Sequence, residues 1–134
     1  MVLFDNHNHS QFSFDGKRTS VESSAMAAVE AGLGGICFSD HCDFYVPPMK
    51  AGFEDLQKEY FDVAEQQAEI SRVQGLIGDK TKILKGIEIG MYEECHEPIR
   101  KVLSENTFDQ IIASVHYIEQ TDPYYGGFYE GKDW

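Results

Sequence analysis

The sequence predicts an α/β fold in which parallel strands alternate with helices. Two observations carry this prediction: four short apolar runs are each bounded by polar or turn-forming residues, and segments with helical spacing separate them. The resulting order, βαβαβαβ, is typical of a parallel sheet with right-handed crossovers. The length of 134 residues falls within the usual range of about 100–200 residues for one domain. We therefore expect residues 1–134 to form a single domain.

The first strand and the first helix are predicted from the amino-terminal part of the sequence. The apolar run Val2-Leu3-Phe4 leads into a polar segment that holds His7 and His9. Thr19 and Glu22 have the spacing of a capping box, which predicts that Thr19 is the N-cap of a helix. Gly32 follows the last apolar position of this helix and predicts its end.

The remaining elements follow from hydrophobic period and boundary residues. Gly75 closes the longest helical pattern, and Pro98 fits the first turn of a later helix. The predicted elements are a strand over Gly35–Ser39, a helix over Phe53–Val73, a strand over Ile83–Ile89, a helix from Pro98 to about Leu103 and a strand over Gln110–Val115.

The composition indicates an acidic globular protein. Lys and Arg number 11 against 23 for Asp and Glu, which gives a formal net charge of −12. This charge argues against a nucleic-acid or membrane partner, because no basic surface is available. It suits a protein that holds cations, or one whose acidic surface keeps it in solution. The three cysteines include no C-x-x-C pair, and no apolar segment indicates a membrane span or a signal peptide, so we expect a cytoplasmic protein with reduced thiols.

Histidines and one carboxylate stand at the carboxyl ends of the predicted strands. The first strand ends in His7-x-His9, the second in Asp40-His41 and the fourth in His116, while Glu88 lies one residue before the end of the third. Residues i and i+2 of an extended segment point to the same side, so His7 and His9 are able to bind one ion together. The carboxyl ends of parallel strands share one face of the fold, where sites are built. We therefore predict that these side chains converge.

The donor types at this face favour a transition-metal site. Asp15 lies on the loop after His9, which lets its carboxylate fold back over the strand end. Imidazole nitrogen combined with carboxylate oxygen suits zinc, manganese or iron. A single strand-end histidine is more often a surface or capping residue, but four of the five histidines fall on this rim together. Two aspartates keep open roles: Asp40 either orients His41 or caps the turn, and Asp43 is ambiguous in the same way.

Five short motifs follow one another along the chain. They are Asp5-x-His7-x-His9-Ser10, Phe14-Asp15-Gly16, Phe38-Ser39-Asp40-His41, Gly86-Ile87-Glu88 and Ser114-Val115-His116-Tyr117. In this order they resemble the motifs of the PHP (polymerase and histidinol phosphatase) superfamily over essentially the whole chain. The segments Asp122–Tyr125 and Phe128–Lys132 that follow them resemble the histidinol-phosphatase branch.

The resemblance implies a distorted, TIM-like (β/α)7 barrel that holds up to three divalent metal ions and hydrolyses phosphate esters. Metal-bound water then acts as the nucleophile, so no protein nucleophile is needed. Glu88, Asp15 and His41 are the implied catalytic residues. The implied metal ligands are His7 and His9 for one ion, Asp15 and His41 for another, and His116 for an ion that shares the bridging Glu88.

The implied substrate is a small phosphorylated molecule, with histidinol phosphate, hydrolysed to histidinol and phosphate in histidine biosynthesis, as the first choice. Lys17 and Arg18 either meet the substrate phosphate or belong to an ordinary solvated turn. Ser10 and Ser39 are expected to form local hydrogen bonds. Two alternatives stay open: a metal-binding remnant without catalysis, and a nuclease of the same superfamily, which the acidic charge disfavours.

The sequence departs from the family pattern after His116. Family members carry three further ligands there, a histidine and an Asp-x-His pair, whereas this chain offers only Asp122, Glu130 and Asp133 in other contexts. A complete barrel of this kind needs about 250 residues. We therefore expect the amino-terminal half of a barrel, truncated after the fourth strand. Its open edges favour pairing with a second copy or with a separate carboxyl-terminal half.

Overall fold

The computed structural model describes residues 2–45, 60–118, 121, 123 and 128–131. Within these ranges no helix is long and apolar enough to cross a membrane. The elements, in chain order, are β1 (Phe4–Asn8), α1 (Val21–Glu30), β2 (Gly35–Phe38), β3 (His41–Cys42), α2 (Val63–Ile77), the short 3-10 turn η2 (Gly78–Lys80), β4 (Lys82–Gly90), the 3-10 turn η3 (Glu93–Cys95), α3 (His96–Glu105) and β5 (Gln110–Ser114).

The strand pairs in the described part of the chain are all parallel, as the sequence predicts. β4 is the central strand, because it pairs with β2, β3 and β5, and β1 extends the sheet beyond β2. β3 resumes the path of β2 after an interruption, since Phe38 lies opposite Lys85 and His41 lies opposite Glu88 on the same neighbouring strand. The second predicted strand therefore exists with a break in it, and the four predicted strands account for the five observed.

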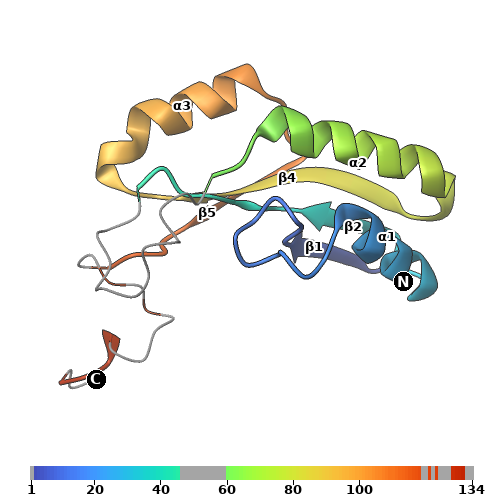
Figure 1. Cartoon of the computed structure of the whole chain (residues 1–134), viewed down its shortest axis with the longest axis horizontal. Helices are drawn as coiled ribbons and strands as arrows, with labels where there is room; N and C mark the ends of the chain where they lie inside the picture. Colours follow the sequence, from blue (N-terminus) through green and yellow to red (C-terminus); the bar gives the residue numbers. More distant parts are fainter. Residues whose placement is uncertain (1, 46–59, 119–120, 122, 124–127, 132–134) are drawn as a thin grey trace.

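The core lies between the sheet and its helices, and Figure 1 shows α2 and α3 on the same side of the long strand β4. Phe38 of β2 and Ile70 of α2 are fully buried in one apolar cluster. Ile87 and Ile89 of β4 belong to a second cluster, which includes Ile99 of α3. Side chains alternate between the two faces of a strand. Glu88, between these two isoleucines, therefore points to the face opposite the helices.

The start of α1 differs from the prediction by one residue. Ser20, not Thr19, is the N-cap, and its side chain forms a reciprocal capping box with Ser23. The Thr19 hydroxyl instead donates to the carbonyl oxygens of Gly16 and His9, which ties the loop after β1 to the helix start. The predicted end is confirmed, because Gly32 follows the C-cap with a φ of 68°.

The helix predicted from about Phe53 to Val73 differs from α2 in residues 60–62 and at its carboxyl end. Asp62 is the N-cap of α2, with its side chain accepting from the Ala64 and Glu65 backbone amides, so residues 60–62 are not helical. Residues 53–59 lie outside the described ranges. The helix runs through Gly75 and ends at Ile77, and its C-cap Gly78 has a φ of 63°, which suits glycine. The predicted helix at Pro98 is confirmed, since Pro98 falls in the first turn of α3.

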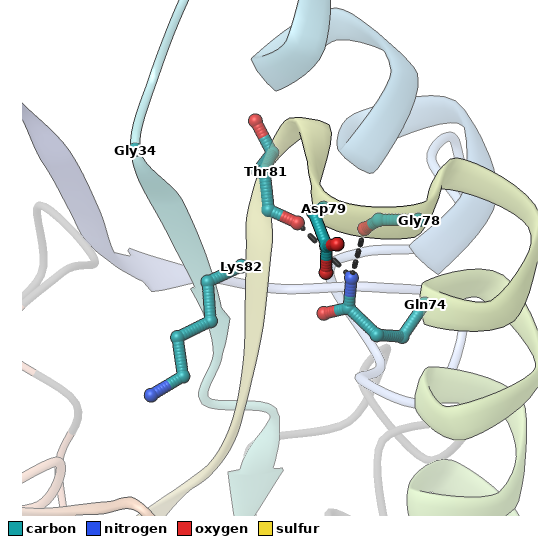
Figure 2. A pocket seen from close by; sticks show the side chains of 6 residues that line it. All are labelled: Gly34, Gln74, Gly78, Asp79, Thr81 and Lys82. Carbon is teal, nitrogen blue, oxygen red and sulfur yellow. Dashed lines mark hydrogen bonds between the residues drawn. The ribbon is translucent and has the colours of Figure 1, made fainter.

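A pocket lies at the amino-terminal ends of β2 and β4, away from the predicted ligands. Figure 2 shows Gln74 reaching from the end of α2 toward the turn that leads into β4. Its amide nitrogen donates to the carbonyl oxygens of Gly78 and Thr81, and its amide oxygen accepts from the Ile83 backbone. These hydrogen bonds hold the α2–β4 connection in place, so we assign the residues around this pocket a structural role. Its lining residues are Gly34, Gln74, Gly78, Asp79, Thr81 and Lys82.

Candidate metal centre

The six residues predicted as ligands converge at the carboxyl ends of the strands. His7 lies in β1, His9 directly after it, and His41 in β3. The His9 and His41 ring centroids are 4.4 Å apart, and those of His41 and His116 are 4.6 Å apart. Three overlapping groups of ligand atoms result. They are His7, His9 and Glu88; His9, Asp15 and His41; and His41, Asp43 and His116.

The first group joins β1 to β4. The Nε2 atoms of His7 and His9 are 3.1 Å apart and lie 3.0 Å and 3.1 Å from Oε2 of Glu88. An octahedral ion with bonds of about 2.1 Å places neighbouring ligand atoms about 3 Å apart, so these three atoms have the spacing of one face of such a site. Two imidazoles and a carboxylate also form the donor set that zinc, manganese or iron accepts.

The second group brings the loop after β1 over the strand ends. Nδ1 of His9 lies 2.8 Å from Oδ2 of Asp15, and Nε2 of His41 lies 3.7 Å from the same oxygen. The Asp15 side chain is 42% exposed, against 13% for His41. Each of the first two groups thus has one half-exposed ligand, His7 or Asp15, beside better buried partners. Lys17 and Arg18 are exposed on the same loop.

The third group contains a residue that sequence reasoning did not select. Oδ1 of Asp43 lies 2.8 Å from Nδ1 of His116, and Oδ2 lies 3.4 Å from Nδ1 of His41. Asp43 is buried. The signal available in the sequence was its i+2 spacing from His41, the same spacing that relates His7 to His9.

Glu88 connects the first group to His116. Its Oε2 atom faces His7 and His9, while its Oε1 atom accepts a 2.5 Å hydrogen bond from the Ser114 hydroxyl and lies 3.1 Å from Nε2 of His116. Burial raises the pKa of Glu88, but hydrogen bonds with His116, His9 and Ser114 outweigh it and hold that pKa well below its ordinary range. Glu88 therefore stays ionised at neutral pH, as a bridging ligand must.

A buried polar network holds the strand ends in place. Asp40 accepts from the Ser10 backbone amide and hydroxyl and from Nε2 of Gln66, at 2.5 to 2.8 Å. These contacts answer the question left open for Asp40: it anchors the turns after β1 and β2 to helix α2. The Ser10 hydroxyl also accepts the expected local bond, from the Phe12 backbone amide at 3.4 Å. The Ser39 hydroxyl is buried without a hydrogen-bond partner in the described part of the chain, so that expectation was wrong.

Metal binding is expected to release protons at neutral pH. Burial lowers the pKa of His9 and His116, but hydrogen bonds to Glu88 and to Asp15 or Asp43 outweigh it and raise the two values to about 8 and about 10. Below these pKa values both imidazole nitrogens of each ring are protonated, and each ring must lose one of its two N–H protons to bind an ion. Apparent zinc affinity should therefore rise as pH increases from about 6 to about 9. Calorimetric titration in buffers of different ionisation enthalpy measures the released protons. Binding at pH 7 without proton release would contradict this expectation.

The fold and the site define a parallel α/β half-barrel with a cluster of histidines and carboxylates at its strand ends that could hold metal ions. The family model described as the PHP domain matches residues 5–134, and the chain belongs to this family. The resemblance seen in the motifs is thereby confirmed.

Individual relatives point to one branch of the family. A histidinol-phosphatase of Lactococcus lactis subsp. lactis is 36% identical over 126 residues, which are 94% of this chain and 44% of that protein. The crystal structure of histidinol phosphate phosphatase from the same organism, complexed with zinc, L-histidinol and phosphate, matches with a TM-score of 0.82 at 33% identity, over 97% of this chain and 46% of that one.

A second solved structure supports the fold alone. A protein from Listeria monocytogenes matches with a TM-score of 0.68 at 18% identity, over 87% of this chain and 46% of that one. The chain therefore spans about half the length of the relatives it matches. The expected half-barrel of parallel strands is confirmed.

Proposed function

We propose that this chain carries the metal-binding half of a phosphomonoesterase that hydrolyses histidinol phosphate or a close analogue. The observation that carries the proposal is the cluster itself: His7, His9 and Glu88 have ligand spacing, and Glu88 extends to His116 through its second oxygen. The relative with 33% identity holds zinc, histidinol and phosphate, which are the metal and the two products of this reaction.

Each side chain has a distinct part in the proposed site. His7 and His9 hold one ion and Asp15 and His41 another, while His116 holds an ion that shares the bridging Glu88. Zinc, manganese or iron ions, when bound, neutralise phosphate oxygens, lower the pKa of a bound water and stabilise the leaving alkoxide. The ligand side chains would fix the positions of the metal ions before the substrate binds. Such preorganised charge makes the largest contribution to the rate enhancement of many enzymes.

The test is phosphate release from histidinol phosphate and from an aryl phosphate, with zinc, manganese or iron added. We expect turnover that requires metal and favours histidinol phosphate. Turnover on this chain alone should be weak, because the three ligands that the family carries on later strands have no counterpart in its motifs. Metal-loaded protein that hydrolyses neither ester would contradict the proposal and favour the metal-binding remnant.

We also propose that a second copy of this chain covers the open edges of the sheet in the cytoplasm. In the described part of the chain β1 pairs with β2 alone and β5 with β4 alone. Leu3, Ile111 and Val115, on or beside these edges, are all more than half exposed. Unpaired edges with apolar side chains favour pairing with another chain. The three buried cysteines are free thiols, which is typical of a reducing compartment.

A further inference from the structure

We propose that Asp43 is a positioning residue: it accepts the Nδ1–H of His116 and thereby directs the Nε2 lone pair of that ring toward the ion shared with Glu88. The inference rests on the proposed function, because it assigns His116 to a metal ion. It goes beyond that function by giving a role to a carboxylate that the family motifs leave unassigned.

The His116 ring lies between two carboxylates. Its Nδ1 atom lies 2.8 Å from Oδ1 of Asp43, and its Nε2 atom lies 3.1 Å from Oε1 of Glu88. The Asp43 side chain is 2% exposed, against 20% for His116. Water is therefore kept from the Asp43 side of the ring, where the hydrogen bond fixes the orientation of the imidazole.

The lone pairs of the His41 and His116 rings distinguish a ligand from a hydrogen-bond acceptor at Asp43. A neutral imidazole has one N–H and one lone pair, so it binds one ion and donates one hydrogen bond. If Asp43 were a ligand, its ion would take Nδ1 of both His41 and His116. Nε2 of each ring would then carry the proton and could not bind an ion beside Asp15 or Glu88. With Asp43 as hydrogen-bond acceptor, both Nε2 atoms stay available at those two carboxylates.

The same assignment accounts for two buried atoms. Nδ1 of His41 and Oδ2 of Asp43 lack a hydrogen-bond partner in the described part of the chain, yet they lie 3.4 Å apart. Nδ1 of His41 also lies 3.5 Å from Oε2 of Glu88; with Asp43 as the acceptor, rotation of the ring toward Asp43 lets the Nδ1–H donate to Oδ2. Asp43 then serves two histidines with its two oxygens, and both rings present Nε2 to the metal side.

Strand β4 leaves space for the Asp43 carboxylate at Gly90. Gly90 pairs with Ser114 at the end of the strand. A Cβ atom at Gly90 would overlap Oδ1 of Asp43 and lie 3.3 Å from Nδ1 of His116. A side chain at this position would therefore displace the hydrogen bond. Glycine here is part of how the fold builds the Asp43–His116 pair.

The test is zinc affinity of Asp43→Asn, measured by competition with a chromophoric chelator. Hydrogen-bonded carboxylates behind metal-binding histidines typically contribute about 10–100-fold to metal affinity. We expect a loss in that range, with the number of ions bound at saturation unchanged. The matched control is Asp62→Asn, which makes the same change at the α2 N-cap, where the carboxylate contacts backbone amides. This control should bind zinc like the wild type.

A second readout reports the nitrogen directly. In zinc-loaded wild-type protein, long-range ¹H–¹⁵N spectra should show His116 protonated at Nδ1 and metal-bound at Nε2. Metal on Nδ1, or the loss of one ion at saturation in Asp43→Asn, would make Asp43 a ligand and overturn the proposal. Wild-type affinity in Asp43→Asn would overturn it as well, while leaving the metal centre intact.

Two further variants keep the test independent of folding defects in Asp43→Asn. Gly90→Ala should lower zinc affinity in the same direction, because its methyl group displaces the Asp43 carboxylate. Gly75→Ala, in an open position on α2 with nothing within 4 Å, should leave affinity unchanged. Equal zinc affinity in the two alanine variants would contradict the proposal. A wild-type chain that binds none of the three metals would overturn the proposed function itself, and this inference with it.

Discussion

Replacing Glu88 by glutamine is expected to abolish phosphate-ester hydrolysis and to lower the bound metal content at the same time. Glutamine keeps the shape of the side chain but removes the negative charge that faces His7, His9 and His116. In the proposed site Glu88 bridges two ions, and glutamine leaves a single neutral oxygen in place of two charged ones, so both ions lose a negative partner. Each lost electrostatic contribution to the transition state is worth about 10²–10³ in rate, and two together should bring the weak activity proposed for this chain to background.

The measurement pairs elemental analysis with phosphate release. The matched control is Glu69→Gln, which changes a glutamate on α2 whose partner is Arg72, and it should keep both metal and activity. Circular dichroism confirms that each variant is folded. A Glu88→Gln protein with full metal content and wild-type turnover would show that the charge at Glu88 does not hold the ions.

The chain is also expected to form a dimer or larger assembly at high concentration. The β1 and β5 edges each lack a second neighbour in the described part of the chain, and Ile111 on β5 is 51% exposed. Lys at an edge strand disfavours pairing with another chain, so Ile111→Lys should shift the protein toward the monomer. Light scattering after size-exclusion chromatography gives the mass directly.

The control for this experiment is Leu76→Lys, because Leu76 on α2 is also an exposed apolar residue, at 62%, but lies away from the strand edges. Its assembly should match that of the wild type. A single species of 15.2 kDa at high concentration would rule out the second copy. Mass that rises only after a carboxyl-terminal half is added would assign the open edges to that segment instead.

The sequence predicted the parts of the site that depend on strand periodicity. His7 and His9 share a face because an extended chain repeats every two residues, and Glu88 stands out because an apolar strand surrounds it. These signals are local, so they can be recognised in the sequence without knowing which strands lie next to each other. The convergence of His41 and His116 followed from the rule that parallel strands place their carboxyl ends on one face.

The sequence did not predict the features that depend on contacts between distant segments. Asp43 becomes significant only when β5 brings His116 to it, 73 residues further along the chain. The start of α2 was placed too early because helical spacing extends into residues 60–62, while the Asp62 side chain caps the helix at Val63. Ser20 displaces Thr19 as N-cap because the Thr19 hydroxyl bonds the carbonyl of His9. Periodicity does not register such competing hydrogen bonds.

The break between β2 and β3 has a consequence for the entropy of ion binding. At this break the Ser39 amide donates to Asn8 and the Glu88 amide donates to Asp40, so the backbone of three strands is fixed where the ligands begin. Ordering the main chain costs about 1–2 kcal/mol per residue. An ion that binds to the ligands on these strands has to order their side chains but little of their main chain, so most of this cost is avoided there. The Asp15 loop and the segment that carries His116 after β5 lie outside this frame. The entropy cost of ordering main chain on ion binding is thus confined to these two segments, while His7, His41 and Glu88 are held by the fixed strands.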